Sequence, residues 1–530
     1  MALNIRILFG TETGNAEDCS HVLADALEDG GYEATVTDMV EYSPTDLAQE
    51  ALVLIVTSTY GNGDPPYNAE KLMDWLKSSE SSVSGVPFAV CGLGDRTYPK
   101  FVQAGIDFDR LMEERGGKRV VPRQDCDVEY EAPFEAFQTA VLSWLDTNAD
   151  NLSAKESQQL SNPQPDATES EKTAELGTRG RPVSATLVSR KRLNQQGSEK
   201  ETIHYEFSWS GSQVRFHPGD SFAVVPTNNP VEVRKILSCV DADESTLVDV
   251  GNESMSLKDA LVRTRDLQII TPELQSLFGL PKSVSNDDHV LDALSRQARV
   301  QVEAQQFIDA LKKLKPRLYS VANSPLVHPD GVHFTVETLR YTCGGREREG
   351  VATTWLADRV SDGDVVDMYC VQAPHFRVPD QVEVPVIMIG PGTGIAPFRA
   401  FLQHRKAQDD AGENWLFFGH QHQATDFLYE KELRGFIDDG TLNELSLAWS
   451  RDQDEKVYVQ HLIAEQGADI WAWLQQDAHV YVCGDKINMA PQVRSAFVDV
   501  VVKYGGLSES EAEARLQEWE LSGRYSVDAY

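Results

Sequence analysis

The sequence predicts a multidomain α/β protein with a parallel-sheet domain at each end and a middle region of strands and helices. Apolar runs alternate with amphipathic stretches at the beginning and at the end of the chain, which is typical of doubly wound parallel sheets. A length of 530 residues exceeds what one hydrophobic core supports, so about three domains are expected. A polar stretch at 148–180 has no apolar periodicity and is interpreted as a flexible linker.

The expected elements follow the apolar periodicity along the chain. In the first domain, helices are expected at 16–29 and 69–78, and strands at 5–9, 33–38, 51–57, 86–91 and 119–122. After the linker, a mostly helical segment is expected at 231–312, and strands at 183–188, 202–209, 221–225, 317–322 and 332–339. The parallel alternation then resumes with strands at 384–389, 415–418, 444–448 and 478–483.

Charge and cysteine content narrow the possible functions. A net charge of −35 argues against nucleic acid as a main partner, because phosphates are neutralised by Lys and Arg. Residues 1–150 have 27 acidic and 10 basic side chains, which either keep the protein soluble or steer a basic redox partner, or both. Seven scattered cysteines without a close pair argue against zinc and disulfides and fit a reducing cytoplasm. No apolar run reaches the ~20 residues that span a bilayer, and the N-terminus has no signal peptide, so a cytoplasmic location is expected.

Three loops at strand ends predict an FMN site in the first domain. The loop GTETGNA at 10–16 joins a strand to a helix, where hydroxyl and N–H groups can surround a phosphate. It contains no lysine, so a monophosphate fits better than a triphosphate. The loops STYGNGD at 58–64 and GLGDRTY at 92–98 follow two further strands, and ligands of such sheets bind at these ends. Tyr60 and Tyr98 are suited to stack on a flat ring, so this domain resembles flavodoxin.

The segment RLYS at 317–320 predicts a second flavin site. Arg317 is a permanent cation suited to a diphosphate, Tyr319 can stack on an isoalloxazine ring, and Ser320 can hydrogen-bond near the flavin N5. Gly350 opens a helix that is expected to end near Asp358, and hydroxyl residues follow the glycine. This helix start is interpreted as an anion site for the pyrophosphate of FAD.

The strand 384–389 and the turn GPGTG at 390–394 predict a nicotinamide-nucleotide site. Ser450 and Arg451 follow a later strand and precede Lys456, Tyr458 and Gln460. This group suits a 2′-phosphate and favours NADPH over NADH, although a solvated charge cluster is the alternative.

The end of the last apolar strand and the C-terminus complete this second half of the chain. Cys483 ends that strand near the expected nicotinamide, although strand-end cysteines are often core residues. Tyr530 would cover the FAD ring until the nicotinamide displaces it, where a frayed tail is the alternative.

Together these motifs resemble the diflavin reductase family, and within it the flavoprotein subunits of bacterial NADPH–sulfite reductases. The resemblance covers almost the whole chain apart from the linker. It implies a flavodoxin-like FMN domain at 1–147, a linker at 148–180, and a ferredoxin–NADP reductase-like FAD β-barrel at 181–383. A helical connecting insertion at about 231–312 interrupts the barrel, and an NADPH-binding α/β domain follows at 384–530.

The resemblance also implies the site residues, which are grouped here by cofactor. FMN would be held by Thr11, Glu12, Thr13, Gly14, Asn15, Ala16, Ser58, Thr59, Tyr60, Gly61, Leu93, Gly94, Asp95, Arg96, Thr97, Tyr98, Pro99, Lys100, Phe101 and Val102. FAD would be held by Arg317, Leu318, Tyr319, Ser320, Thr335, Val336, Glu337, Tyr341, Gly350, Val351, Ala352, Thr353 and Tyr530. NADPH would be held by Thr393, Ser450, Arg451, Lys456, Val457, Tyr458, Val459 and Gln460, and hydride transfer would be assisted by Ser320, Cys483, Asp528 and Tyr530.

The activity that the resemblance implies is electron transfer from NADPH through FAD and FMN to a metal centre on a partner protein. That partner would be a sulfite reductase haemoprotein with sirohaem and an iron–sulfur centre, so that sulfite is reduced to sulfide. A reductase for a P450-type haemoprotein and an electron carrier without NADPH chemistry remain as alternatives. Two features depart from the family: the FMN domain begins almost at Met1 without an N-terminal extension, and Gln492 stands where an acidic residue is usual.

Overall fold

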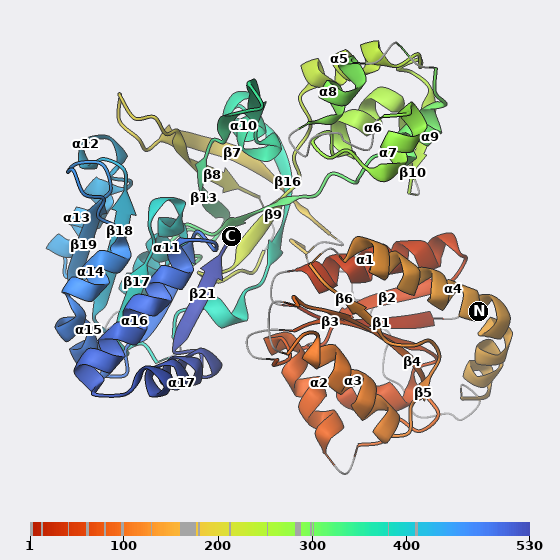
Figure 1. Cartoon of the computed structure of the whole chain (residues 1–530), viewed down its shortest axis with the longest axis horizontal. Coiled ribbons are helices and arrows are strands. Elements are labelled where there is room, and N and C mark those ends of the chain that lie inside the picture. The colour runs from red at the N-terminus through yellow and green to blue at the C-terminus, as the bar shows by residue number, and fades with distance from the viewer. Residues whose placement is uncertain are drawn as a thin grey trace. The chain divides into compact units, whose positions relative to one another are not determined.

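The computed structural model describes residues 4–11, 14–40, 42–59, 63–78, 81–96, 100–128, 130–159, 176–178, 181–210, 214–251, 253–280, 288–296, 299, 301–379, 381–408 and 412–530. Figure 1 shows the chain, which divides into two compact units, Met1–Ser170 and Glu171–Tyr530. The division falls within the predicted linker, and each unit is described by itself.

The first unit is built on a parallel sheet with the strand order of a doubly wound fold. The order is β2 (Glu33–Asp38), β1 (Asn4–Gly10), β3 (Val53–Ser58), β4 (Pro87–Leu93) and β5 (Lys118–Arg119), and β6 (Gln124–Cys126) also pairs with β4. The predicted strands of this domain are therefore confirmed, and their ends differ by at most two residues except for 119–122, where β5 ends three residues earlier.

Helices cover both faces of this sheet, because its strands are apolar on both sides. One face packs against α1 (Asn15–Asp29) and α4 (Glu131–Gln159), and the other against α2 (Tyr67–Lys77) and α3 (Gln103–Glu114). Figure 1 shows the two helix pairs on opposite sides of the sheet.

Helix α4 is longer than the sequence predicts. The linker is expected from residue 148, but the helix continues to Gln159. Leu152 explains the extension, because it lies two helical turns after Leu145 and is buried in the same apolar cluster. The linker prediction was therefore wrong for residues 148–159, and most of its remainder, 160–175 and 179–180, lies outside the described residues.

The second unit begins with an antiparallel barrel. Its strand order is β12 (Arg317–Ser320), β9 (Ser221–Val224), β16 (Val365–Val371), β7 (Val183–Arg192), β8 (Thr202–Ser208) and β13 (Gly331–Glu337). A bridge between Val321 and Phe334 joins the two end strands and closes the sheet. Helix α10 (Val351–Asp358) begins directly after Gly350, as predicted.

A separate apolar core holds the insertion between β9 and β12. Its helices are α5 (Pro230–Cys239), α6 (Leu257–Arg263), α7 (Pro272–Phe278), α8 (Val290–Ser295) and α9 (Ala304–Asp309). Two hairpins were not predicted: β10 (Leu247–Val250) with β11 (Glu253–Ser256) in the insertion, and β14 (Arg340–Cys343) with β15 (Arg346–Glu349) after the barrel strand β13.

A second parallel sheet ends the chain, in the order β19 (Glu444–Trp449), β18 (Asn414–His420), β17 (Val386–Ile389), β20 (His479–Gly484) and β21 (Tyr525–Ala529). It is covered by α11 (Ile395–Ala407), α13 (Glu430–Asp438), α14 (Val459–Glu465), α15 (Gly467–Leu474), α16 (Met489–Gly505) and α17 (Glu509–Leu521). The edge strand β21 was missed by the sequence analysis. Among the described residues, no helix combines the length and apolar composition that crossing a bilayer requires.

Candidate flavin and coenzyme sites

The loop after β1 folds back onto the start of α1. The Thr11 amide donates to Asn68 Oδ1 at 2.9 Å, and the Gly14 amide donates to Thr11 Oγ1 at 2.9 Å. Gly14 has a left-handed backbone (φ 83°), which glycine adopts at little cost. The turn therefore leads directly to the N-terminus of a helix, where backbone N–H groups attract anions. Glu12 and Thr13 lie outside the described residues.

Asn68 helps to position the loop after β1, and the sequence analysis did not predict this role. It is buried at the start of α2, and its amide nitrogen also donates to Asp38 Oδ1 at 2.9 Å. It thereby connects the loop after β1, which is predicted to hold a phosphate, to the end of β2. A single asparagine in a helical pattern gives no local signal of such a role.

The loops after β3 and β4 are joined to each other at the same sheet edge. The Thr59 amide donates to the Leu93 carbonyl at 3.0 Å, and the Ala104 amide donates to Thr59 Oγ1 at 3.2 Å. Arg96 stacks over the Phe101 ring at 4.9 Å. Because both strands are parallel, these loops and the one after β1 meet at the carboxyl edge of the sheet.

The remaining predicted FMN residues are placed by their surroundings or not described. Leu93 and Val102 are buried, and Lys100 is exposed. The predictions for Tyr60, Gly61, Thr97, Tyr98 and Pro99 lie outside the described residues, so the two stacking tyrosines stay predictions.

In the second unit, the structure brings Ser320, Cys483 and Asp528 together. Cys483 and Asp528 are register partners on the parallel strands β20 and β21. The Ser320 hydroxyl, at the end of β12, donates to Asp528 Oδ2 at 3.3 Å. Burial raises the pKa of the Asp528 carboxyl, and burial with the nearby Asp528 charge raises the pKa of the Cys483 thiol. The cluster therefore favours a neutral thiol beside a carboxyl that holds its proton more tightly than usual.

The glycine turn after β17 packs closely against the end of β20. A Cβ atom on Gly394 would lie 2.1 Å from the Cys483 carbonyl oxygen, so this approach requires glycine. Thr393 lies in the same turn, and its hydroxyl lies 2.7 Å from the Tyr530 hydroxyl. This close packing holds the turn, which leads into the N-terminus of α11, against the end of the Cys483 strand.

The C-terminal Tyr530 is tied to the sheet. Its amide donates to the Gly484 carbonyl at 3.0 Å, and its carbonyl accepts from the Lys486 amide at 3.2 Å. The residue as a whole is 64% exposed, whereas burial raises the pKa of its hydroxyl, with Cys483 and Asp528 nearby. The tail is therefore anchored by its backbone and by the contact of its hydroxyl with Thr393, beside the cluster of Ser320, Cys483 and Asp528.

The RLYS strand presents alternating side chains, as β12 pairs with β9. The Tyr319 ring lies 5.8 Å from that of Phe334, and its hydroxyl is buried without a hydrogen-bond partner among the described residues. Burial also raises the pKa of Tyr319. Arg317 is partly exposed, and its guanidinium donates to the Lys315 carbonyl at 2.7 Å. An unsatisfied buried hydroxyl next to a partly exposed cation is consistent with a bound polar ligand.

The other predicted FAD residues lie on β13, on β14 and at the start of α10. Thr335 is buried and its hydroxyl lies 2.6 Å from that of Tyr429, while Glu337 pairs with Lys200 at 2.5 Å. Tyr341 is exposed on β14. Thr353 accepts from the Leu339 amide at 3.1 Å, which joins the start of α10 to the end of β13. The structure therefore places these residues around one end of the barrel.

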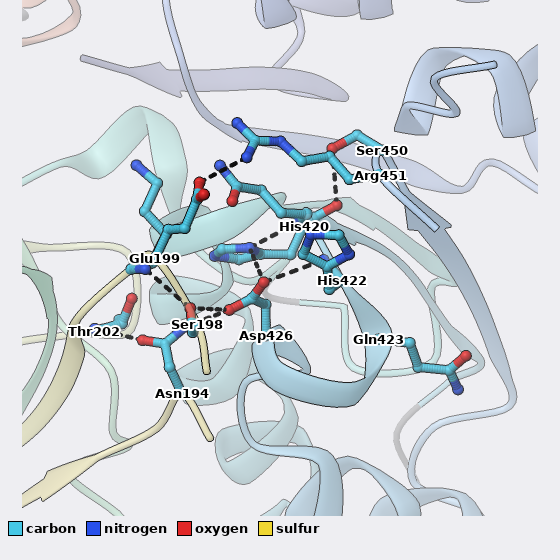
Figure 2. A network of polar contacts seen from close by, with 12 residues as sticks. Asn194, Ser198, Glu199, Thr202, His420, His422, Gln423, Asp426, Ser450 and Arg451 are labelled. Carbon is cyan, nitrogen blue, oxygen red and sulfur yellow. Dashed lines mark hydrogen bonds and ion pairs between the residues drawn. The ribbon is translucent and has the colours of Figure 1, made fainter. Parts of the chain in front are cut away.

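The predicted 2′-phosphate residues follow the end of β19. The Ser450 hydroxyl donates to the His420 carbonyl at 3.2 Å. Arg451 Nη1 donates to Glu199 Oε2 at 2.7 Å, a contact that Figure 2 shows and that the sequence analysis missed. Lys456 and Tyr458 are exposed, Val459 is buried, and Gln460 donates to Gln492 Oε1 at 2.6 Å. Gln492, which departs from the family pattern, thus contacts a predicted coenzyme residue.

A histidine cluster lies apart from these residues. Ligand atoms of His204, Glu206 and His333 lie within 4.8 Å of one another. Arg399 Nη1 lies 3.4 Å from His333 Nδ1, and the Tyr429 hydroxyl lies 2.8 Å from His204 Nδ1. The permanent positive charge of Arg399 beside these side chains disfavours binding of a metal ion. The contacts instead join the barrel strands to α11 and to the start of α13.

A cavity of about 490 Å³ lies beside β7, α12 (Gln423–Asp426) and the start of α13. Its walls include Lys191, Arg192, Phe427 and Lys431. None of the residues predicted to bind a cofactor lines this cavity, so we do not assign it to a flavin or to the coenzyme.

Three family models match the chain. The flavodoxin model matches residues 7–144, the FAD-binding domain model matches 178–282 and 267–355, and the oxidoreductase NAD-binding domain model matches 388–495. The matched regions contain the three FMN loops, the RLYS strand with Gly350, and the glycine turn with Ser450, Arg451 and Cys483.

Similar proteins match over nearly their whole length. The sulfite reductase (NADPH) flavoprotein alpha-component of Bacillus subtilis (strain 168) is 36% identical over 99% of this chain and 89% of that protein. The protein of the same name from Mannheimia succiniciproducens is 36% identical over 100% of this chain and 90% of the relative. That from Neisseria meningitidis serogroup B is 37% identical over 99% and 89%.

Proposed function

Since this chain belongs to the family of sulfite reductase (NADPH) flavoprotein alpha-components, we propose that its electron acceptor is a sulfite reductase haemoprotein. The chain is an NADPH-dependent flavoprotein oxidoreductase that uses FMN and FAD and passes electrons from NADPH to FAD and on to FMN. The proposed acceptor carries sirohaem and an iron–sulfur centre and reduces sulfite to sulfide. The names of the relatives support this choice, and a cytoplasmic location stays a prediction.

The observation that carries the proposed site is the meeting of three distant segments beside Cys483. β12 contributes Ser320, the glycine turn contributes Thr393, and the C-terminal strand contributes Asp528 and Tyr530. When bound, the flavin and nicotinamide rings supply the hydride chemistry, and the protein supplies binding and orientation. Ser320 and Asp528 would hold a proton near the reacting atoms, and Tyr530 would cover the flavin face that the nicotinamide needs.

The family membership also supports proposed domain bounds and roles for the remaining residues. We place the FMN domain at 1–159, because α4 continues to Gln159, the FAD barrel at 181–383 and the NADPH domain at 384–530, and the order of the matched family models supports this division. FMN would bind the loops after β1, β3 and β4. The FAD pyrophosphate would bind Arg317 and the start of α10.

Reconstitution tests the proposed acceptor. The purified chain is mixed with a sulfite reductase haemoprotein, NADPH and sulfite, and sulfide is measured. We expect sulfide only when both proteins are present, with NADPH consumption to match. A matched reaction contains a P450-type haemoprotein in place of the sulfite reductase component. Rapid haem reduction in this second reaction, together with no sulfide in the first, would identify the chain as a reductase of P450-type haemoproteins instead.

The coenzyme site is tested by Arg451→Ala. A charge-assisted hydrogen bond contributes about 1.5–3 kcal/mol, so losing it should raise the KM for NADPH about ten- to a hundredfold. The KM for NADH should change little, because NADH has no 2′-phosphate. Ferricyanide reduction with each coenzyme measures both values. Equal losses with the two coenzymes would place Arg451 outside the 2′-phosphate site.

A further inference from the structure

We infer that Glu199 is a specificity-determining residue of the coenzyme site, because its carboxylate holds the Arg451 guanidinium when no 2′-phosphate is bound. The inference rests on the proposed role of Arg451. Arg451 Nη1 donates to Glu199 Oε2 at 2.7 Å, although 252 residues separate the two in the chain. A 2′-phosphate has to displace this carboxylate or bind beside it, whereas NADH meets no such competition.

The position of Glu199 is set by buried contacts. The segment that carries it connects β7 to β8 and is held by Asp426, whose side chain is fully buried. Asn194 Nδ2 donates to Asp426 Oδ1 at 2.9 Å, and Ser198 Oγ donates to the same oxygen at 2.5 Å. In Figure 2, Asn194, Ser198 and Glu199 lie to the left of Asp426. Glu199 therefore follows directly after a residue anchored in the protein interior.

The same aspartate is connected to the proposed coenzyme site from the other side. The His422 amide donates to Asp426 Oδ2 at 3.1 Å. The neighbouring Gln421 carbonyl accepts from the Arg451 amide at 2.9 Å. The chain just after β18 therefore carries both the anchor of the Glu199 segment and the backbone of Arg451. This shared support places the backbones of Glu199 and Arg451 so that their exposed side chains can meet.

The expected effect is modest because the ion pair is exposed. The Arg451 side chain is 45% exposed and that of Glu199 is 75% exposed, and such pairs are weakened by solvent and salt. A phosphate brings more charge than a carboxylate and can win this competition. Glu199 therefore lowers the affinity for NADPH without preventing its binding, and it narrows the difference between NADPH and NADH.

The test compares Glu199→Gln with the unchanged protein by calorimetry. The probes are 2′,5′-ADP, which carries the 2′-phosphate, and 5′-AMP, which does not. We expect 2′,5′-ADP to bind about two- to fivefold more tightly to the variant, a difference that shrinks as salt rises. Binding of 5′-AMP should not change. In steady-state assays the KM for NADPH should fall by a similar factor and that for NADH should stay constant.

Glu518→Gln is the matched control. Glu518 pairs with Arg515 at 3.2 Å, and the exposed fractions are 70% and 51%, close to those of the Glu199 pair. It removes the same charge and should leave both probes unaffected. Equal tightening in the two variants would mean that only the overall negative charge matters, and the inference would be wrong.

Arg451→Ala separates this inference from the proposed coenzyme site. If Arg451→Ala does not weaken 2′,5′-ADP binding, the proposed site itself is wrong. If it weakens binding but Glu199→Gln does not strengthen it, the site stands and the role of Glu199 is overturned. In the Arg451→Ala background, Glu199→Gln should have no further effect. A persisting effect there would show that Glu199 acts on the phosphate without Arg451, against the inference.

Discussion

At the scale of single residues, the cluster of Ser320, Cys483 and Asp528, which is proposed to assist hydride transfer, contains two groups whose charged forms are disfavoured by burial. Cys483 is fully buried, and the pKa of its thiol lies well above the usual range. Burial also raises the pKa of Asp528, although His375 and the Ser320 hydrogen bond act against it. At the proposed site, a neutral thiol and a carboxyl with raised proton affinity would add little negative charge next to a flavin that becomes negative when it accepts a hydride.

Tyr530→Ala tests the gate that the anchored tail would form. Removing the ring should expose the flavin face, so we expect tighter binding of oxidised NADP and a weaker preference against NADH. Product inhibition by oxidised NADP and the two coenzyme KM values measure this. Tyr530→Phe serves as the control, because it keeps the ring and removes only the hydroxyl contact to Thr393 at 2.7 Å, and it should have a smaller effect. Unchanged coenzyme kinetics in Tyr530→Ala would mean that the ring does not cover the flavin.

At the scale of elements, the carboxylates of buried Asp288 and partly buried Asp292 join the helical insertion to the β14–β15 hairpin. Asp288, just before α8, accepts from Arg296 at 2.6 Å and from Arg346 at 2.9 Å. Asp292 accepts from Arg348 at 2.6 Å. These contacts fix the insertion to a hairpin near the predicted FAD residue Tyr341, so they connect the stability of the insertion to the flavin site.

Asp288→Asn should weaken this connection in a pH-dependent way. The hydrogen bond from Arg296, followed by that from Arg346, lowers the pKa of Asp288 to about 2. An unfolded Asp has a pKa of about 3.9, so the carboxylate stabilises the fold above that pH and loses its contribution as the pH falls toward 2. We expect the variant to be less stable by about 1.5–3 kcal/mol at neutral pH, with a smaller difference near pH 3.

Hydrogen exchange of the α8, β14 and β15 amides measures this difference, with both variants compared at each pH. The control is Asp241→Asn, which removes an exposed ion pair with Arg299 at 3.2 Å in the same insertion and should change little. A difference that is constant with pH would show that the charge of Asp288 is not what stabilises the contact.

At the scale of the whole molecule, the chain contains separate binding regions for two flavins. Both sets of loops are present in the matched flavodoxin and FAD-binding regions. We therefore expect about one FMN and one FAD per chain, since each site binds one ring system. Acid release followed by chromatography measures both. A preparation that contains a single flavin species at full occupancy would contradict the assignment of two flavin domains.

Electron delivery should depend on the acidic first domain and on the predicted linker. Residues 1–150 have a net charge of −17, which would steer a basic acceptor. We expect acceptor reduction to slow as salt rises, because the Debye length is only ~10 Å at 0.1 M. Deleting most of residues 160–175, whose composition predicts a linker with a reach of about 20–25 Å, should impair acceptor reduction and spare ferricyanide reduction. Full acceptor reduction by the shortened protein would argue against a moving domain.

The sequence by itself determined the parallel sheets and the motifs at their strand ends. GTETGNA, RLYS and GPGTG were predictable because glycine, hydroxyl and strand residues follow one another directly in each, so the signal is local. The structure places RLYS on β12 and the other two at the ends of β1 and β17, and the family models match the same regions.

Only the tertiary structure decided which distant side chains meet. Strand β21 has no apolar run of its own and forms because Tyr525 is buried and its ring packs against that of Phe497 at 5.7 Å. The extension of α4 depends on Leu152 reaching the core, and the contacts of Asn68, Asp426 and Glu199 join residues far apart in the chain. Periodicity reports the neighbours of a residue along one element, whereas these contacts depend on packing between elements, which no local pattern encodes.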